Sequence, residues 1–137
     1  MFVLKKILNS GRNVPEYCRV ATTAGVSYQV GSALTINNGK LINATATDMP
    51  KYIAAESAAA DEKTTLLCYP VYSNMIFEVP MGISGISTVN TGDKVVLYLS
   101  DGYAIKVGTN KTDGVATVVD KNGAQFVGDK VYVKFEN

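Results

Sequence analysis

Apolar and β-branched residues fall in short runs along this chain, and turn-forming residues separate the runs. The clearest case has an apolar run at residues 95–99, a turn signal at Asp101-Gly102, and residues 103–107, where large apolar side chains alternate with Ala or Lys. A period of two on either side of a short turn is typical of a half-buried antiparallel pair. The pattern therefore predicts a β-hairpin here.

The rest of the chain repeats this spacing. Asn38-Gly39 and Asn122-Gly123 predict tight turns, because Asn and Gly tolerate positive φ. The letters GDKV occur twice, each time just before an apolar run. Further strands are expected at residues 17–22, 26–30, 34–36, 40–43, 51–56, 63–72, 75–79, 86–89, 115–120, 125–127 and 131–135. Turn signals at this density predict an all-β fold, a small antiparallel β-barrel or sandwich with little helix.

Two stretches need a choice between elements. Residues 57–62 contain three consecutive alanines, which suit a short helix by propensity, but they have no wide apolar face and lie among strands. We therefore expect a loop there. Pro70, in the strand expected at 63–72, lacks an N–H, so we expect an edge position or a bulge there.

Residues 1–16 differ from the rest, because Asn9, Gly11 and Pro15 interrupt any regular element. We expect an extended N-terminal arm at 1–16 and a single β domain at 17–137. The arm's apolar side chains either complete the domain core or contact a neighbouring subunit. They are Phe2, Val3, Leu4, Ile7 and Leu8. Because Lys5 and Lys6 break this run, no signal peptide is expected, and no segment approaches the roughly 18 apolar residues of a membrane span.

The composition bears on possible chemistry. With 13 basic and 12 acidic residues, the 137-residue chain has a net charge of +1, which predicts neither nucleic-acid nor membrane-surface binding. Histidine, the commonest general base and metal ligand, is absent. Carboxylates that could act in acid–base pairs come from separate loops and strands: Asp48, Glu56, Asp61, Glu62 and Glu78. We expect no catalytic residue, no cofactor and no metal site.

The aromatic residues and the two cysteines each allow two interpretations. Eight tyrosines and four phenylalanines could stack on bases in an OB-like barrel, but the basic residues are scattered, so core and interface packing explains them better. Cys18 and Cys68 are fifty residues apart and are interpreted as reduced thiols, with a disulfide between them left open. Residues 95–99 are apolar on both faces, which indicates burial by a second sheet or by another subunit.

Two regions together resemble the small capsid decoration (cement) proteins of tailed bacteriophages. The first comprises Pro50-Lys51-Tyr52-Ile53-Ala54, Glu56, residues 58–60, Tyr69-Pro70-Val71 and Met75-Ile76-Phe77-Glu78-Val79. The second comprises Gly92-Asp93-Lys94-Val95, Tyr98, Asp101-Gly102, Gly114-Val115-Ala116 and residues 130–135. The resemblance covers about residues 25–136 and consists of turns and apolar positions.

This resemblance implies a non-enzymatic virion protein that is made in the bacterial host cytoplasm. It would bind the major capsid protein on the exterior of an expanded shell, commonly as a homotrimer, and stabilise the shell against internal DNA pressure. The five apolar residues of the arm are our candidates for contact with the capsid or a neighbouring subunit. The alternative is a non-catalytic binding module of a phage tail or baseplate with a carbohydrate or protein ligand. A carbohydrate module would need clustered exposed aromatics, for which Tyr69, Tyr72 and Tyr103 are the candidates.

Overall fold

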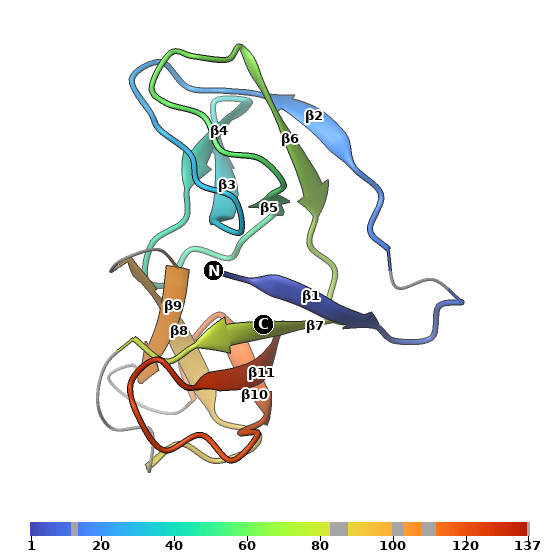
Figure 1. Ribbon diagram of the computed structural model, residues 1–137, viewed down its shortest axis with the longest axis vertical. Coiled ribbons are helices and arrows are strands. Elements are labelled where there is room, and N and C mark those ends of the chain that lie inside the picture. Colours follow the sequence, from blue (N-terminus) through green and yellow to red (C-terminus); the bar gives the residue numbers. More distant parts are fainter. Residues whose placement is uncertain (12–13, 83–87, 100–102, 108–111, 137) are drawn as a thin grey trace.

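The structure is a computed structural model that describes residues 1–11, 14–82, 88–99, 103–107 and 112–136. These residues form eleven β-strands and no α-helix (Figure 1). The strands are β1 (Val3–Ile7), β2 (Cys18–Ala21), β3 (Ala33–Asn37), β4 (Lys40–Asn43), β5 (Tyr52–Ala54), β6 (Thr65–Pro70), β7 (Met75–Pro80), β8 (Lys94–Leu99), β9 (Tyr103–Val107), β10 (Ala116–Asp120) and β11 (Lys130–Phe135).

The strands form two antiparallel sheets. One has six strands in the order β1-β7-β11-β10-β8-β9, and the other has five in the order β2-β6-β5-β3-β4. Figure 1 shows the five-stranded sheet above and the six-stranded sheet below, with β1 running along the region where they meet. The six-stranded sheet curls so far that Met81, just after β7, makes a parallel bridge to Ile105 of β9. The predicted all-β fold is confirmed as a sandwich-like arrangement that is not closed into a barrel.

Both hairpins that the sequence predicts most clearly are present. β8 and β9 pair antiparallel from Val95↔Val107 to Leu99↔Tyr103, and their connecting residues 100–102 lie outside the described part of the chain. β3 and β4 pair across Asn38 and Gly39, whose φ angles of 51° and 77° are the positive values expected of a tight hairpin turn. In the β3–β4 hairpin, the turn has the local geometry that favours this pairing.

The strand expected at 26–30 is wrong. Positive φ at Gly25 and Gly31 bends the chain on either side, so that only Tyr28 makes a bridge, to Ala58. The Tyr28 hydroxyl donates a hydrogen bond to the Leu41 carbonyl at 2.7 Å. The side chain is thereby buried in the five-stranded half, although its backbone joins no sheet.

The strand expected at 125–127 is also wrong. These residues form a loop, because turns on both sides leave too few residues to pair. β6 is a central strand without a bulge, but its pairing with β2 ends at Cys68, so Pro70 pairs only with β5 and has the expected edge position on its other side. It is tolerated as the last residue of β6, where the ladder ends. Residues 57–62 form a loop, as predicted. A strand is also expected at residues 86–89, and residues 86–87 of it lie outside the described part of the chain.

The main hydrophobic core lies in the six-stranded half and extends into the other sheet. Its large members from β7, β8, β9 and β11 include Phe77, Val79, Val95, Leu97, Ile105, Val131 and Val133. Ala33, Ile53 and Tyr69 of the five-stranded sheet belong to the same cluster. Val95, Val96 and Leu97 are all buried, as predicted for a strand that is apolar on both faces, and this chain alone covers them.

The GDKV repeat marks the same turn twice. Gly92 and Gly128 have φ angles of 93° and 91°. In each turn the following aspartate carboxylate accepts a backbone N–H from three residues earlier, at 2.8 Å in Asn90→Asp93 and 2.9 Å in Phe126→Asp129. Strands β8 and β11 begin directly after these turns.

Candidate interaction surface

The N-terminal segment is the edge strand of the six-stranded sheet. β1 pairs antiparallel with β7, and the Leu8 N–H donates to the Asn74 carbonyl at 2.8 Å. The Phe2 N–H donates to the Gly31 carbonyl of the other half at 2.9 Å. The sequence left open whether this segment packs on its own domain or on a neighbour. Residues 2–8 pack on their own domain in the structure.

Phe2 itself is a core residue. Its side chain is 2% exposed, and its ring lies 5.2 Å from that of Phe135 and 6.2 Å, edge to face, from that of Phe77 (centroid distances). The other four apolar residues of the segment are half-buried. Val3 and Leu4 line a surface groove, and Leu4 and Ile7 pack against the core cluster. Of the five candidate contact residues, Phe2, Val3 and Leu4 line this groove, and of these three only Phe2 is fully buried.

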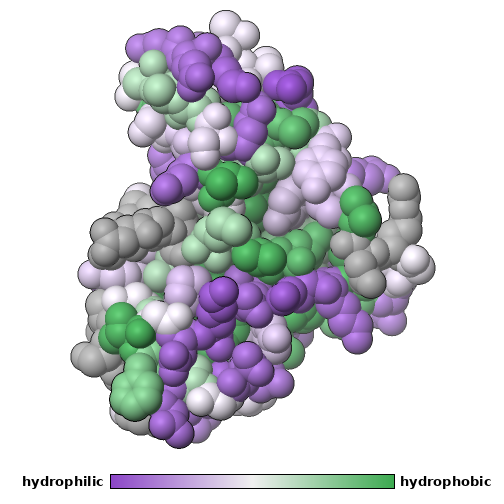
Figure 2. All heavy atoms as spheres, viewed as in Figure 1, coloured by the Kyte–Doolittle hydropathy of each residue, from purple (hydrophilic) through white to green (hydrophobic). Residues whose placement is uncertain are grey.

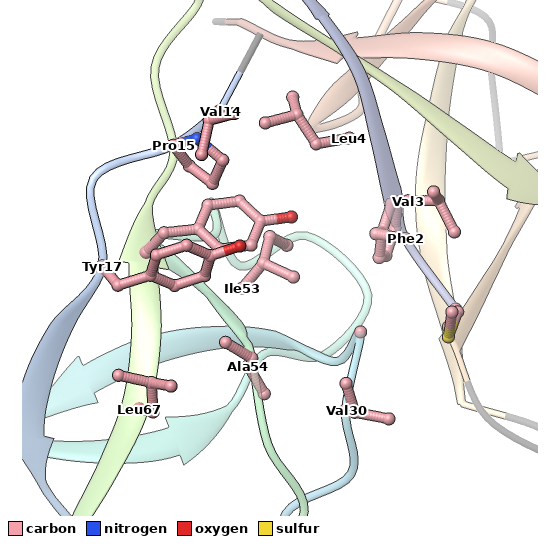
Figure 3. A pocket seen from close by; sticks show the side chains of 14 residues that line it. Phe2, Val3, Leu4, Val14, Pro15, Tyr17, Val30, Ile53, Ala54 and Leu67 are labelled. Carbon is pink, nitrogen blue, oxygen red and sulfur yellow. The ribbon is translucent and has the colours of Figure 1, made fainter.

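An apolar groove of about 500 Å³ separates β1 from the five-stranded sheet (Figure 3). Its lining residues come from the N-terminal segment, the approach to β2, and the facing strands β5 and β6. They are Met1, Phe2, Val3, Leu4, Val14, Pro15, Tyr17, Val30, Gly31, Ile53, Ala54, Ala55, Leu67 and Tyr69. Met1, Val14, Tyr17 and Val30 are at the same time among the large hydrophobic side chains that remain exposed. Figure 2 shows hydrophobic surface in the middle of this face, where the two sheets meet.

Two tyrosines form one wall of the groove. The rings of Tyr17 and Tyr69 lie 5.9 Å apart between centroids in a T-shaped pair. Tyr69 is buried, and burial raises the pKa of its phenol well above the ordinary range, so it stays neutral. Tyr17 is 55% exposed and can contact a ligand directly. It occupies this position because the next residue begins β2, which pairs with the β6 strand that carries Tyr69.

The loop between β10 and β11 provides a second apolar surface. Phe126 is 71% exposed, and Val127 beside it is also exposed. The Asp129 carboxylate accepts the N–H groups of Gln125 (2.8 Å) and Phe126 (2.9 Å), and these bonds lower the pKa of Asp129. The loop therefore presents its apolar side chains from an ordered backbone. Figure 2 shows a second hydrophobic area at the lower left, where Figure 1 places this loop.

The five carboxylates considered as acid–base candidates all have structural contacts. Three of them accept backbone N–H groups. Asp48 and Glu62 close turns by accepting from Thr45 and Ala59, three residues earlier, and Asp61 joins two loops by accepting from Gly25. Glu78 lies between Lys5 and Lys130, at 3.7 and 3.5 Å. Glu56 accepts the Leu67 N–H at 2.9 Å, and this bond, followed by the Lys63 ammonium at 3.2 Å, lowers its pKa. None of the five lines the groove.

Within the described residues, no three His, Cys, Asp or Glu side chains gather as a possible metal site. No helix among them is long and apolar enough to cross a membrane. Of the aromatics considered for a carbohydrate site, Tyr69 is buried, Tyr72 is exposed, and the Tyr103 side chain lies outside the described part. Among the described residues, the groove and the loop at Phe126 are the two surfaces with exposed large apolar side chains that we consider for binding.

The sequence interpretation did not identify several residues of these two surfaces. They are Val14, Tyr17, Val30, Phe126 and Val127. The exposure of Phe126 and Val127 could have been predicted from the sequence, because the turn residues Asn122-Gly123 and Gly128-Asp129 leave only four residues between two turns. Tyr17 and Val30 had no such signal, because the groove that they line is formed by segments that are far apart in the chain. Comparison of the sequence with protein-family models and with curated proteins found no match.

Proposed function

We propose that this protein is a structural virion component that binds the outer surface of an expanded bacteriophage capsid and stabilises it against internal DNA pressure. Its partner is the major capsid protein, and the bound form is a homotrimer on the shell. It acts without catalysis, cofactor, nucleic acid or membrane. It is made in the bacterial host cytoplasm and resides on the capsid exterior.

The apolar groove beside β1 is the observation that carries this proposal. A near-neutral chain has little long-range electrostatic attraction to a partner, so apolar contact must provide most of the affinity. The groove and the loop at Phe126 provide two such surfaces on a rigid β framework. The proposal that the partner is a capsid protein comes from the resemblance to decoration proteins. The residues that carry this resemblance lie on β5 to β8, β10 and β11.

Stabilisation of the shell would follow from mass action. A ligand that binds only the expanded shell lowers the free energy of that state by about 2.7 kcal/mol per site at a hundred times its Kd. Many equivalent sites make this a large total for one particle. No conformational change in the decoration protein is required.

The structure refines which arm residues to test. Deleting the first twelve residues would remove Phe2 from the core and β1 from the sheet, so it would test folding as much as binding. Val3, Leu4, Val14 and Tyr17 line the groove without being fully buried, and they are the better targets.

Co-sedimentation with undecorated expanded capsids, with unexpanded procapsids alongside, tests the proposal. We expect saturable binding to expanded capsids only, at a copy number that matches the three-fold sites. Tyr17→Ser should weaken binding at least about tenfold, as expected for an interface aromatic. Tyr72→Ser is the matched control: Tyr72 is 58% exposed, close to the 55% of Tyr17, but does not line the groove.

The outcomes distinguish the two candidate functions and the two surfaces. If Tyr17→Ser and Tyr72→Ser weaken capsid binding equally, the groove is not the binding surface. The variant Val127→Ser then tests the β10–β11 loop as the binding surface. If the protein binds neither form of the capsid, the tail or baseplate module becomes the leading function. The Tyr17–Tyr69 wall favours that second candidate, since an aromatic groove can hold a peptide or a sugar ring.

A further inference from the structure

Cys18 and Cys68 are directly opposite each other on neighbouring antiparallel strands. Cys18 opens β2 and Cys68 lies on β6, in a register that continues without a shift to Ala21↔Thr65. Their Sγ atoms lie 3.9 Å apart, and both are free thiols. The pairing brings together two side chains that are fifty residues apart in the chain.

This geometry is close to that of a disulfide. Opposed residues of antiparallel strands have Cα atoms about 4.5–5.5 Å apart, within the range of about 4.4–6.8 Å that disulfides span. The sulfur atoms need to approach by about 2 Å to reach bonding distance. Side-chain rotation can provide much of this movement, so the strands can stay paired.

We propose that Cys18 and Cys68 are a redox-active pair that forms an intrachain disulfide by exchange with a small disulfide such as oxidised glutathione. The Cys18 thiolate attacks the small disulfide, forms a mixed disulfide and releases one small thiol. The Cys68 thiolate then attacks the Cys18 sulfur and releases the second. The two protein thiols are oxidised, the small disulfide is reduced, and the protons leave with the two small thiols.

The burial of the two residues sets this order. Cys18 is half-buried and Cys68 is fully buried, so only Cys18 can be reached by a reagent from solvent. Burial raises the pKa of Cys68 to about 12, so little of it is thiolate at neutral pH, which slows its attack. The short distance between the sulfurs compensates, because the second exchange is intramolecular.

The bond would tie an edge strand to the strand beside it. Among the described residues, β2 lies at the edge of the five-stranded sheet and pairs with β6. The core of this half is the smaller cluster that contains Cys68, Leu66 and Leu34. A link across fifty residues restricts the unfolded chain, so oxidation should raise the stability of the folded protein.

The test begins with the fully reduced, full-length protein under native conditions. After incubation with oxidised glutathione, we expect both thiols to be lost, a monomer two hydrogen atoms lighter, and a non-reduced peptide map that joins Cys18 to Cys68. Its Tm should rise by about 10 °C and return to the starting value with dithiothreitol.

Two variants serve as controls. Cys68→Ala should stop at the mixed disulfide on Cys18, and Cys18→Ser should leave Cys68 unreacted while the protein is folded. The proposal is overturned if the folded wild type keeps two free thiols, stops at the mixed disulfide, or forms only disulfide-linked dimers. None of these readouts involves a capsid, so the result is independent of the proposed function.

Discussion

Single acidic side chains close many of the turns in this protein. Asp93 and Asp129 each accept backbone N–H groups of the turn that precedes them, and Asp48 and Glu62 do the same in two further turns. A carboxylate held by N–H donors favours its charged form, which is why hydrogen bonds lower the pKa of Asp129. The acidic residues of this chain therefore contribute to local structure.

The hydrogen bond and ion pair of Glu56 make the stability of the fold depend on pH. The pKa of Glu56 is lowered, first by the Leu67 N–H and then by Lys63, so its contribution to stability is present above pH 4.5 and is lost as the pH falls through the folded-state value. We expect Glu56→Gln to lower the Tm by about 1–3 °C at pH 7. The difference from wild type should shrink below pH 4.5. Thermal unfolding from pH 7 to pH 3 measures this, and a difference that stays constant over that range would contradict it.

Gly114 shows how close backbone packing restricts a residue. A Cβ at this position would lie 2.6 Å from the Val95 carbonyl oxygen, in the backbone of β8. We expect Gly114→Ala to reduce the free energy of unfolding by about 1–3 kcal/mol because backbone must move. Gly11→Ala is the control, since nothing lies within 4 Å there and it should change stability by less than about 0.5 kcal/mol. Urea unfolding of both variants gives the comparison, and equal midpoints would refute the packing argument.

The first strand changes role between sequence and structure. Its polar interruptions predict an extended arm, but in the structure β1 pairs with β7 at the edge of the sheet. The Phe2 ring packs in the main core, where it forms a group of three aromatic rings with Phe77 and Phe135. The same docking creates the groove, because β1 forms its lower wall.

Removing the Phe2 ring should therefore destabilise the whole fold. We expect Phe2→Ala to lower the free energy of unfolding by about 3–5 kcal/mol, the usual range for a buried phenylalanine. Tyr72→Ala, at an exposed position, should stay within about 0.5 kcal/mol of wild type. Guanidinium unfolding measures both. If Phe2→Ala proved no more destabilising than Tyr72→Ala, the segment would not belong to the core.

The two sheets share one core. Ala33, Ile53 and Tyr69 extend the main cluster from the six-stranded half into the five-stranded half, and backbone hydrogen bonds such as Phe2 N–H to Gly31 also connect the halves. A shared core makes it costly for one half to unfold while the other stays intact.

We accordingly expect the molecule to unfold in a single transition. Calorimetry should show one peak with equal calorimetric and van 't Hoff enthalpies, of about 95 kcal/mol near 60 °C for a chain of this length. Ile53→Ala, which removes a contact between the halves, should move that peak to lower temperature without splitting it. Two separate peaks in the wild type would show that the halves are independent domains.

The sequence by itself determined the all-β class, the β3–β4 and β8–β9 pairings and the burial of Val95, Val96 and Leu97, because turn residues and apolar alternation act over a few neighbouring positions. It failed at 26–30 and 125–127, where glycine or aspartate turns override strand propensity. Only the tertiary structure decided that Phe2 completes the core, that Tyr17 and Tyr69 share a groove, and that Cys18 faces Cys68. These contacts join residues far apart in the chain, and their formation depends on sheet order, which local patterns do not specify.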